Sequence, residues 1–299
     1  MPPKSKLSRS SKAVSKGSSK RAKVLPSTYG EEFALNRIVA NVRRATEHAQ
    51  LPENVVTELF EQKATVSYLT ADCKSWVYHV PRWYWHIFQY ATLEQVSFDD
   101  KGTSILPTTW STLFKQAWDA HPKDYDTIMM FGKPVKLPRF QQLCGDIRSY
   151  RYSGKTYQAQ KTFPPGLWHA VQHMERIVKD PATERTRLTG GLVNWYESGD
   201  HYIGPHADDE RDMIACSPIV ALSLGATRRF VFTKKHLQSA VVSGDAVPRM
   251  ELQVGDGDLM IMGGFTQMTH KHAVPKMTRC REPRISVTLR CFHAQQLEK

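Results

Sequence analysis

The sequence predicts a mainly β protein with flanking helices, an α+β chain. Its centre is expected to be a double-stranded β-helix of the jelly-roll, cupin-like type, preceded by an N-terminal helical extension. Between residues 190 and 292, short segments that are apolar or alternating follow one another, separated by turns rich in Gly, Asp and Pro. No periodic segment of helical length interrupts this series, which is typical of sandwiches and jelly rolls. The expected strands are residues 191–196, 218–224, 229–233, 250–254, 259–262 and 285–292.

Residues 1–30 are predicted to form a disordered basic tail. The chain has 299 residues and a net charge of +12, and residues 1–23 contain eight Lys and Arg but no acidic residue. This Ser- and Lys-rich segment has almost no apolar side chains, so burial cannot offset the entropy lost on ordering. Such a tail can direct a protein to the nucleus or bind phosphates loosely. The alternative is a tail that only improves solubility.

Residues 31–90 are predicted to be the helical and aromatic N-terminal extension. Apolar residues recur at helical spacing from Phe33 to Val42, and the pattern returns at residues 54–61. Residues 74–90 are dense in aromatic side chains, which we expect to pack against the β domain. A platform on which bases stack is the alternative.

A further helix is expected over residues 105–120, where it would support the β domain. Its apolar residues fall on one face at helical spacing. These residues are Trp110, Leu113, Phe114 and Trp118.

Cysteine usage and hydropathy indicate an intracellular protein without a membrane partner. The chain has five cysteines, an odd number, and none of them forms a Cys-x-x-Cys pair. A disulfide framework is therefore not expected, whereas a reducing compartment fits. The basic tail lacks the apolar run of a secretory signal, and no stretch approaches the length of a membrane span.

The motif His206-Ala207-Asp208 predicts a metal site. Residues two apart on a strand point to the same side, so both side chains can reach one ion. Two histidines and one carboxylate can occupy one face of an Fe(II) octahedron and leave the opposite face open. His270 and His272 are the candidates for the third ligand. They are two residues apart and would point to the same side of a strand, so the strand period does not decide between them.

Two arginines on the last expected strand predict a site for carboxylates. Arg284 and Arg290 are six residues apart and therefore share a face of that strand. A guanidinium matches a carboxylate through two parallel hydrogen bonds. Because the strand is otherwise apolar, such cations would be buried and would need a partner.

Several blocks together resemble the AlkB family of Fe(II)- and 2-oxoglutarate-dependent nucleic-acid dioxygenases, most closely the members that repair duplex DNA. The resemblance covers roughly residues 90–294, which we assign to a dioxygenase domain of residues 91–295. The matching blocks are Asn194-Trp195-Tyr196, His206 to Glu210, Ser217-Pro218-Ile219, Leu224-Gly225-Ala226, Arg229-Phe230 and Arg281 to Arg290.

The resemblance implies Fe(II), 2-oxoglutarate and O2 as cofactor and co-substrates. The family block that begins at Gln267 aligns His272 with the third metal ligand, beside His206 and Asp208. By the same resemblance, Arg284 would bind the distal carboxylate of 2-oxoglutarate and Arg290 would help to hold the end of 2-oxoglutarate near the iron. Asn194 and Tyr196 add hydrogen bonds to the co-substrate.

A second implication is a hairpin that enters the base stack of duplex DNA. In residues 129–139, Phe131 would be the apolar wedge that fills the gap left by an extruded base. Lys133, Lys136 and Arg139 would face phosphates. The alternative is an ordinary strand end with a core phenylalanine.

Residues 146–154 resemble the family's lid over the extruded base. Tyr150, Tyr152 and Ser153 would contact the base, and one tyrosine ring could sandwich it against His206. An aromatic ladder on a sheet is the alternative for the tyrosines. Asp209 and Glu210 could accept hydrogen bonds from the base, unless they lie in a solvated turn.

The implied function is direct-reversal DNA repair, the oxidative demethylation of 1-methyladenine and 3-methylcytosine. The expected protein is a monomer that acts on nucleic acid in the nucleus, to which the basic tail would direct it, with the cytoplasm as a second location. Two alternatives remain. One is an RNA demethylase or protein-modifying dioxygenase of the same fold. The other is a catalytically inactive nucleic-acid-binding module.

Overall fold

The computed structural model describes residues 51–87, 110–130, 132–147, 149–152, 155–178, 188–235 and 245–293. The predicted tail, the helical pattern from Phe33 to Val42, Phe131 and Ser153 lie outside these residues. Within the described part no helix is long and apolar enough to cross a membrane.

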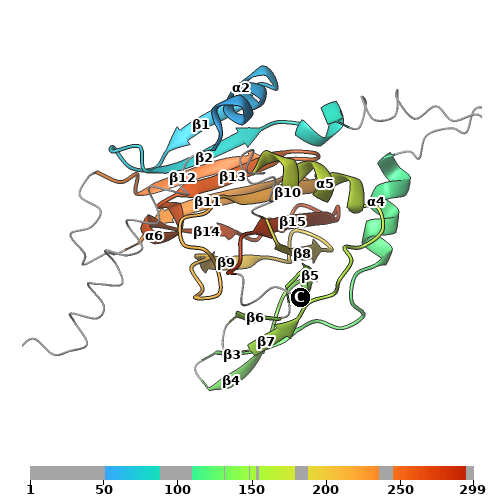
Figure 1. The fold of residues 1–299 in the computed structure, drawn as a ribbon. Coiled ribbons are helices and arrows are strands. Elements are labelled where there is room, and N and C mark those ends of the chain that lie inside the picture. Colours follow the sequence, from blue (N-terminus) through green and yellow to red (C-terminus); the bar gives the residue numbers. More distant parts are fainter. Residues whose placement is uncertain are drawn as a thin grey trace, which may run out of the picture. The chain divides into compact units, whose positions relative to one another are not determined.

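Two antiparallel sheets form the centre of the fold (Figure 1). The larger sheet has the order β1-β2-β13-β10-β15-β8-β5 and the smaller one the order β12-β11-β14-β9. The strands of the larger sheet are β1 (Thr65–Tyr68), β2 (Ser75–Val80), β5 (Phe140–Gly145), β8 (Gly190–Tyr196), β10 (Ile219–Gly225), β13 (Leu259–Gly264) and β15 (Arg284–Arg290). The strands of the smaller sheet are β9 (Ile203–His206), β11 (Arg228–Lys234), β12 (Arg249–Val254) and β14 (His270–Val274).

The prediction of a mainly β, jelly-roll fold is confirmed. Each expected strand of residues 190–292 is present, with ends that differ by one or two residues. The short helix α6 (Thr266–Thr269) connects β13 to β14.

Side chains alternate between the two faces of the larger sheet, and this alternation decides which residues face the site. Odd-numbered residues of β8 and β15, such as Trp195 and Val287, belong to the core that the helices cover. Residues of β10 and β13 on the opposite face, such as Ile219 and Met262, form a second core with Phe230 and Phe232 of β11. The polar residues of β8 and β15 face this second layer, so they lie between the two sheets.

Three helices bury their apolar sides in the first core. They are α2 (Glu53–Glu61), α4 (Trp110–Asp119) and α5 (Trp168–Ile177). The predicted helix at residues 105–120 is confirmed over 110–119, where Ala117 is buried and its carbonyl accepts a hydrogen bond of 2.8 Å from Trp195 Nε1. Helix α5 was not expected from the sequence.

Within the expected helical and aromatic extension, residues 65–68 and 75–80 form the strands β1 and β2. Strand β2 pairs with β13, so this segment continues the larger sheet. The helical part of the extension is found at α2, as the pattern at residues 54–61 indicates. The physical reason is local: residues 75–80 are aromatic, β-branched or small, and such residues favour strands over helices.

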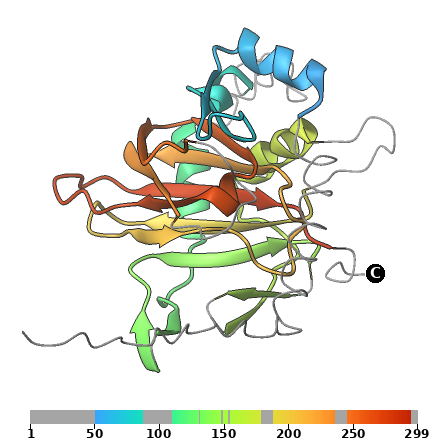
Figure 2. The same ribbon diagram turned by 90° about the vertical axis from the view of Figure 1, so that its left-hand side faces the viewer.

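Two hairpins lie at the same end of the fold, away from α2 (Figures 1 and 2). One pairs β3 (Thr127–Met130) with β4 (Lys133–Lys136), and the other pairs β6 (Ser149–Tyr152) with β7 (Lys155–Gln158). Met130 opposes Lys133 where the two strands of the first hairpin meet. Gly132 has a φ of +75°, a conformation that glycine adopts without steric cost.

Candidate metal and co-substrate site

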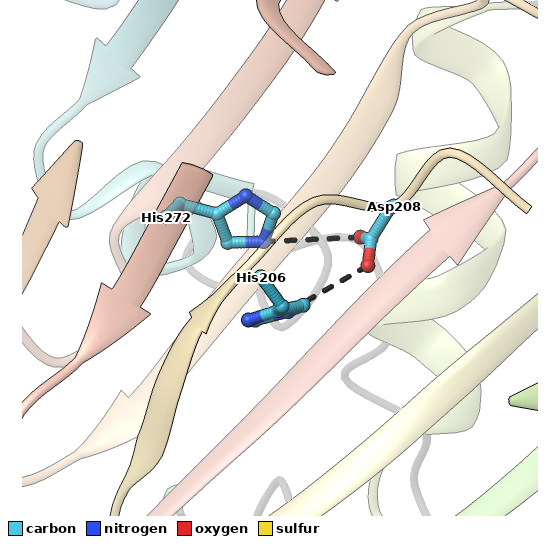
Figure 3. Close-up of side chains that lie close together, drawn as sticks. All are labelled: His206, Asp208 and His272. Carbon is cyan, nitrogen blue, oxygen red and sulfur yellow. Dashed lines mark ion pairs between the residues drawn. The ribbon is translucent and has the colours of Figure 1, made fainter. Parts of the chain in front are cut away.

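His206, Asp208 and His272 come together between the two sheets, and their ligand atoms all lie within 4.8 Å of one another (Figure 3). His206 ends β9 and opposes His272 of β14 in the antiparallel ladder. Asp208 Oδ1 is 3.6 Å from His206 Nε2, and Asp208 Oδ2 is 3.9 Å from His272 Nε2. These three residues are therefore placed to hold one metal ion.

His270, the alternative third ligand, is engaged elsewhere. Its Nδ1 lies 2.8 Å from Thr269 Oγ1 and its Nε2 lies 2.9 Å from the carbonyl oxygen of Val247. Both ring nitrogens thus have partners, and His270 is not among the residues that surround the candidate ion. The geometry favours the choice of His272.

The two histidines are held in the neutral form that binds metals. Burial lowers the pKa of His272 to about 3, and the neighbouring His206 contributes in the same direction. Burial also lowers the pKa of His206. His206 Nδ1 donates a hydrogen bond of 2.9 Å to the carbonyl of Gly204, which leaves the lone pair on Nε2.

Asp208 is ionised and is fixed from two sides. Burial alone would raise its pKa, but the charge and the hydrogen bonds of Arg290 lower it below the ordinary value. Arg290 donates from Nε and Nη2 to Asp208 Oδ2, at 3.1 and 2.9 Å. Gln267 Oε1 accepts a hydrogen bond of 3.0 Å from the Asp208 backbone N–H. Arg290 therefore orients a candidate metal ligand, the carboxylate of Asp208.

Arg284 is buried at another part of the same cavity and has capacity for a further partner. Its Nε donates a hydrogen bond of 2.9 Å to Ser223 Oγ, and its guanidinium carbon lies 5.1 Å from the centre of the Tyr196 ring. Within the described part of the chain, Arg284 forms no ion pair and its buried Nη1 has no hydrogen-bond partner. A buried guanidinium without an anion is unfavourable, so this position suits the carboxylate of a ligand.

Arg139 does not face phosphates, which corrects the expectation from the sequence. Its side chain is only 2 % exposed, and its Nε donates a hydrogen bond of 2.9 Å to Asn194 Oδ1. Its Nη2 donates to Gln141 Oε1 at 3.1 Å. The reason is its place just before β5, where the chain turns into the larger sheet. Lys133, by contrast, is exposed on β4.

The cavity joins these groups. It encloses about 650 Å³ of empty space, part of it open to solvent. The three candidate ligands, Arg284 and Arg290, and the predicted co-substrate contacts Asn194 and Tyr196 all line it. Apolar residues from both sheets complete the wall: Leu192, Ile203, Phe230, Met260 and Met262.

The predicted base contacts are placed only in part. Tyr150 and Tyr152 lie on β6, two residues apart, and their side chains are outside the described part, as are Phe131 and Ser153. Asp209 forms an ion pair of 2.8 Å with Lys235, which competes with the expected contact to a base.

Glu210 begins the turn that follows, because its carbonyl accepts a hydrogen bond from the N–H of Met213.

The sequence analysis did not identify Lys235 and Ser223 as residues of the site. The sequence offers only their positions as an indication: Ser223 lies within an expected strand, and Lys235 lies close to the end of one.

Comparison with known proteins agrees with this geometry. The model of the 2OG-Fe(II) oxygenase superfamily matches residues 105–290. The DNA oxidative demethylase ALKBH2 of Mus musculus is 35% identical over 54% of this chain, and that of Homo sapiens is 34% identical over 54%. The alpha-ketoglutarate-dependent dioxygenase alkB homolog 3 of Mus musculus is 32% identical over 52%.

The chain spans only part of these curated relatives: 65% and 60% of the two ALKBH2 proteins and 52% of the alkB homolog 3. Among solved structures, one of OsALKBH1 shares 16% identity at a TM-score of 0.37, over 60% of this chain and 91% of that chain.

The residues of the cavity fit the cofactor and co-substrates that this superfamily implies, namely Fe(II), 2-oxoglutarate and O2. Two neutral histidines and a carboxylate match Fe(II). The buried Nη1 of Arg284 and the hydroxyl of Ser223 beside it match one carboxylate of a dicarboxylic acid. From this site and from the family match over residues 105–290, we conclude that the chain belongs to the 2OG-Fe(II) oxygenase superfamily and resembles its AlkB members.

Proposed function

We propose that this protein demethylates alkylated bases in DNA by Fe(II)- and 2-oxoglutarate-dependent oxidation. One observation carries the proposal: the three candidate metal ligands and Arg284, with its unsatisfied buried Nη1, line a single cavity. The relatives named DNA oxidative demethylase support DNA as the substrate class. When bound, Fe(II) with 2-oxoglutarate and O2 supplies the oxidation of an N-methyl group, which leaves as formaldehyde.

In this proposal the side chains of the cavity hold and orient the reactants. His206, Asp208 and His272 would hold the ion, and the co-substrates would bind beside these three ligands. Arg284 binds the distal carboxylate of 2-oxoglutarate. Arg290 keeps the Asp208 carboxylate ionised and oriented through its two hydrogen bonds.

Asn194 is oriented by Arg139, because its Oδ1 accepts the hydrogen bond from Arg139 Nε. The Asn194 amide N–H2 therefore remains available to a carboxylate oxygen of the co-substrate. The Tyr196 ring lies against Arg284 and helps to fix the direction of its guanidinium.

The two hairpins are proposed to bind the nucleic acid. The hairpin of β3 and β4 would insert Phe131 into the duplex, with the exposed Lys133 near phosphates. Strand β6, with Tyr150 and Tyr152, would cover the extruded base. 1-methyladenine and 3-methylcytosine are the proposed lesions, because weakened pairing lowers the cost of base flipping. The basic residues 1–23 are proposed to direct the protein to the nucleus.

Mass spectrometry of methylated oligonucleotides tests the proposal. The full chain is incubated with Fe(II), 2-oxoglutarate and oligonucleotides that carry 1-methyladenine or 3-methylcytosine, as duplex DNA, single-stranded DNA and RNA. We expect loss of the methyl group from DNA with release of one succinate for each repaired base. His272→Ala serves as the inactive control. Succinate release without demethylation of any oligonucleotide would overturn the nucleic-acid substrate, and faster repair of RNA would move the substrate class to RNA.

A variant of the hairpin tip tests the preference for duplex DNA. Base–aromatic stacking is worth about 1–3 kcal/mol, which corresponds to about a five- to 150-fold change. Phe131→Ala should lower kcat/KM on methylated duplex DNA by about that factor and change turnover of single strands only a few-fold. Met129→Ala, an exposed apolar residue of the same hairpin, is the matched control. Equal losses on both substrates would instead assign Phe131 a structural role.

A further inference from the structure

Lys235 joins two segments that lie beside the candidate metal site. It follows the last residue of β11, and its side chain is only 16% exposed. The ammonium lies 2.8 Å from Asp209 Oδ2 and donates to the carbonyl of Gln267 at 2.7 Å. Its backbone N–H also donates to the carbonyl of Thr269 at 2.8 Å. One lysine thus connects the residue after a candidate ligand to helix α6.

A second link runs between the same two segments. Gln267 belongs to α6 and is 9% exposed, and its Oε1 accepts the hydrogen bond of 3.0 Å from the Asp208 backbone N–H. Asp208 is therefore attached to α6 by a hydrogen bond, and Asp209 is attached to it through Lys235, which forms the ion pair with Asp209 and donates to α6. Both attachments meet at Gln267, since Lys235 binds its carbonyl.

The position of Asp208 explains why such links are needed. Strand β9 ends at His206, and the next strand of the chain, β10, begins at Ile219. The sheet ladder therefore fixes His206 and His272 but does not reach Asp208. Arg290 orients the Asp208 carboxylate, but its two hydrogen bonds do not hold the backbone of Asp208 and Asp209.

We propose that Lys235 and Gln267 are positioning residues for the metal centre, and that Asp209 is the partner of Lys235 rather than a contact for the substrate base. Lys235 also places a positive charge beside the second of two adjacent carboxylates, which reduces the repulsion between Asp208 and Asp209. The proposal concerns metal binding and does not depend on nucleic acid as the substrate.

Metal affinity in the absence of nucleic acid tests the proposal. Mn(II) binding to the full chain is measured by electron paramagnetic resonance, with and without 2-oxoglutarate. A half-exposed ion pair alone accounts for up to about fivefold in affinity, and loss of groups that orient metal ligands costs about 10- to 100-fold. We expect Lys235→Met to weaken Mn(II) binding about three- to tenfold. Lys234→Met is the matched control, because Lys234 is the neighbouring, exposed lysine, and its affinity should stay unchanged.

Three further variants separate positioning from a general loss of structure. Lys235→Arg keeps the charge and the donors and should restore Mn(II) affinity to within about twofold of the original protein. Gln267→Met leaves the Asp208 N–H unpaired and should weaken binding about tenfold. Asp209→Asn removes only the ion pair, whereas Lys235→Met also removes the hydrogen bond to the Gln267 carbonyl. Asp209→Asn should therefore weaken binding no more than Lys235→Met does, and the double variant should bind no worse than Lys235→Met alone.

Two results would overturn the proposal. The first is Mn(II) affinity in Lys235→Met equal to that in Lys234→Met. The second is an Asp209→Asn variant that keeps its metal affinity but loses turnover of methylated DNA, which would make Asp209 a base contact. Unchanged metal binding with lost demethylation would assign the residue to substrate binding. Weakened metal binding, whether or not the protein demethylates DNA, would support the positioning role of Lys235 and Gln267. The failures of the two proposals are therefore distinguishable.

Discussion

The two faces of the larger sheet are equally buried but chemically opposite. On β15, Ile285 is 0% exposed and packs in the core under the helices, whereas its neighbour Arg284 is 2% exposed and lines the cavity between the sheets. Strand β8 repeats the contrast with Trp195 and Asn194. Burial by itself therefore does not distinguish the core from the site. The difference is whether each buried group already has its partners.

The helix-covered face is complete in itself, because apolar side chains need only contacts. The cavity face holds guanidinium, carboxylate and imidazole groups whose burial is unfavourable unless they are paired. Some of this pairing is present, as between Arg290 and Asp208. Some is left to a ligand, as at Arg284 Nη1. The helix-covered face stabilises the fold, whereas the cavity face lowers the net stability because it holds buried reactive groups that are not fully paired.

The largest expected effect comes from removing a metal ligand on the cavity side. His272→Ala should abolish turnover and weaken Mn(II) binding at least about 100-fold, since three protein ligands leave no substitute. His270→Ala, two residues away on the same strand, should keep most of the turnover because both of its ring nitrogens are bound within the fold. Isothermal titration with Mn(II) and succinate release measure the two effects. The reverse result would make His270 the ligand.

The next effect separates Arg284 from its neighbour on the other face. Arg284→Met removes the charge-assisted hydrogen bonds to the co-substrate and should raise KM for 2-oxoglutarate about 10- to 150-fold. Steady-state kinetics with varied 2-oxoglutarate measure this change. Ile285→Val is the control and should leave KM unchanged. If Arg284→Met kept a normal KM, the distal carboxylate would have to bind elsewhere.

Ile285→Val, the control for Arg284→Met, should change the stability of the fold and not the binding of co-substrate or metal. Ile285→Val removes one buried methylene from the helix-covered core and should lower the free energy of unfolding by about 0.5–1.5 kcal/mol. Denaturant unfolding measures the loss, and Mn(II) titration should show unchanged affinity. A change in affinity without a change in stability would mean that the two faces are not independent.

The smallest effect concerns pH and a histidine on the helix side. Burial, with contributions from His169 and Arg176, lowers the pKa of His173 to about 4. The unfolded chain binds the proton near the ordinary pKa of about 6.5. His173 therefore contributes stability above that value, and the contribution is lost as the pH falls toward 4. Because His173 is only partly buried, the loss between pH 7 and 5 should be about 1 kcal/mol or less.

Unfolding of His173→Gln across this pH range checks the sign. The variant should lose less stability than the original protein when the pH falls, because Gln does not titrate. An equal loss in both proteins would show that other groups set the acid sensitivity of the helix-covered side.

Local patterns in the sequence determined much of this protein. The expected strands of residues 190–292 and the shared face of Arg284 and Arg290 follow from the two-residue period of a strand. This period depends only on the backbone, so it can be read without knowledge of distant contacts. The same holds for the apolar face of α4.

Only the tertiary structure decided which of these faces meet. His270 and His272 have equal parity, and the choice depends on the register between β9 and β14, which pair across more than sixty residues of sequence. Arg139 turned from an expected phosphate contact into a buried partner of Asn194, and Asp209 into a partner of Lys235. The strands β1 and β2 joined a sheet whose nearest member, β13, begins at Leu259. Such contacts depend on how distant strands pack, and a local period carries no information about that packing.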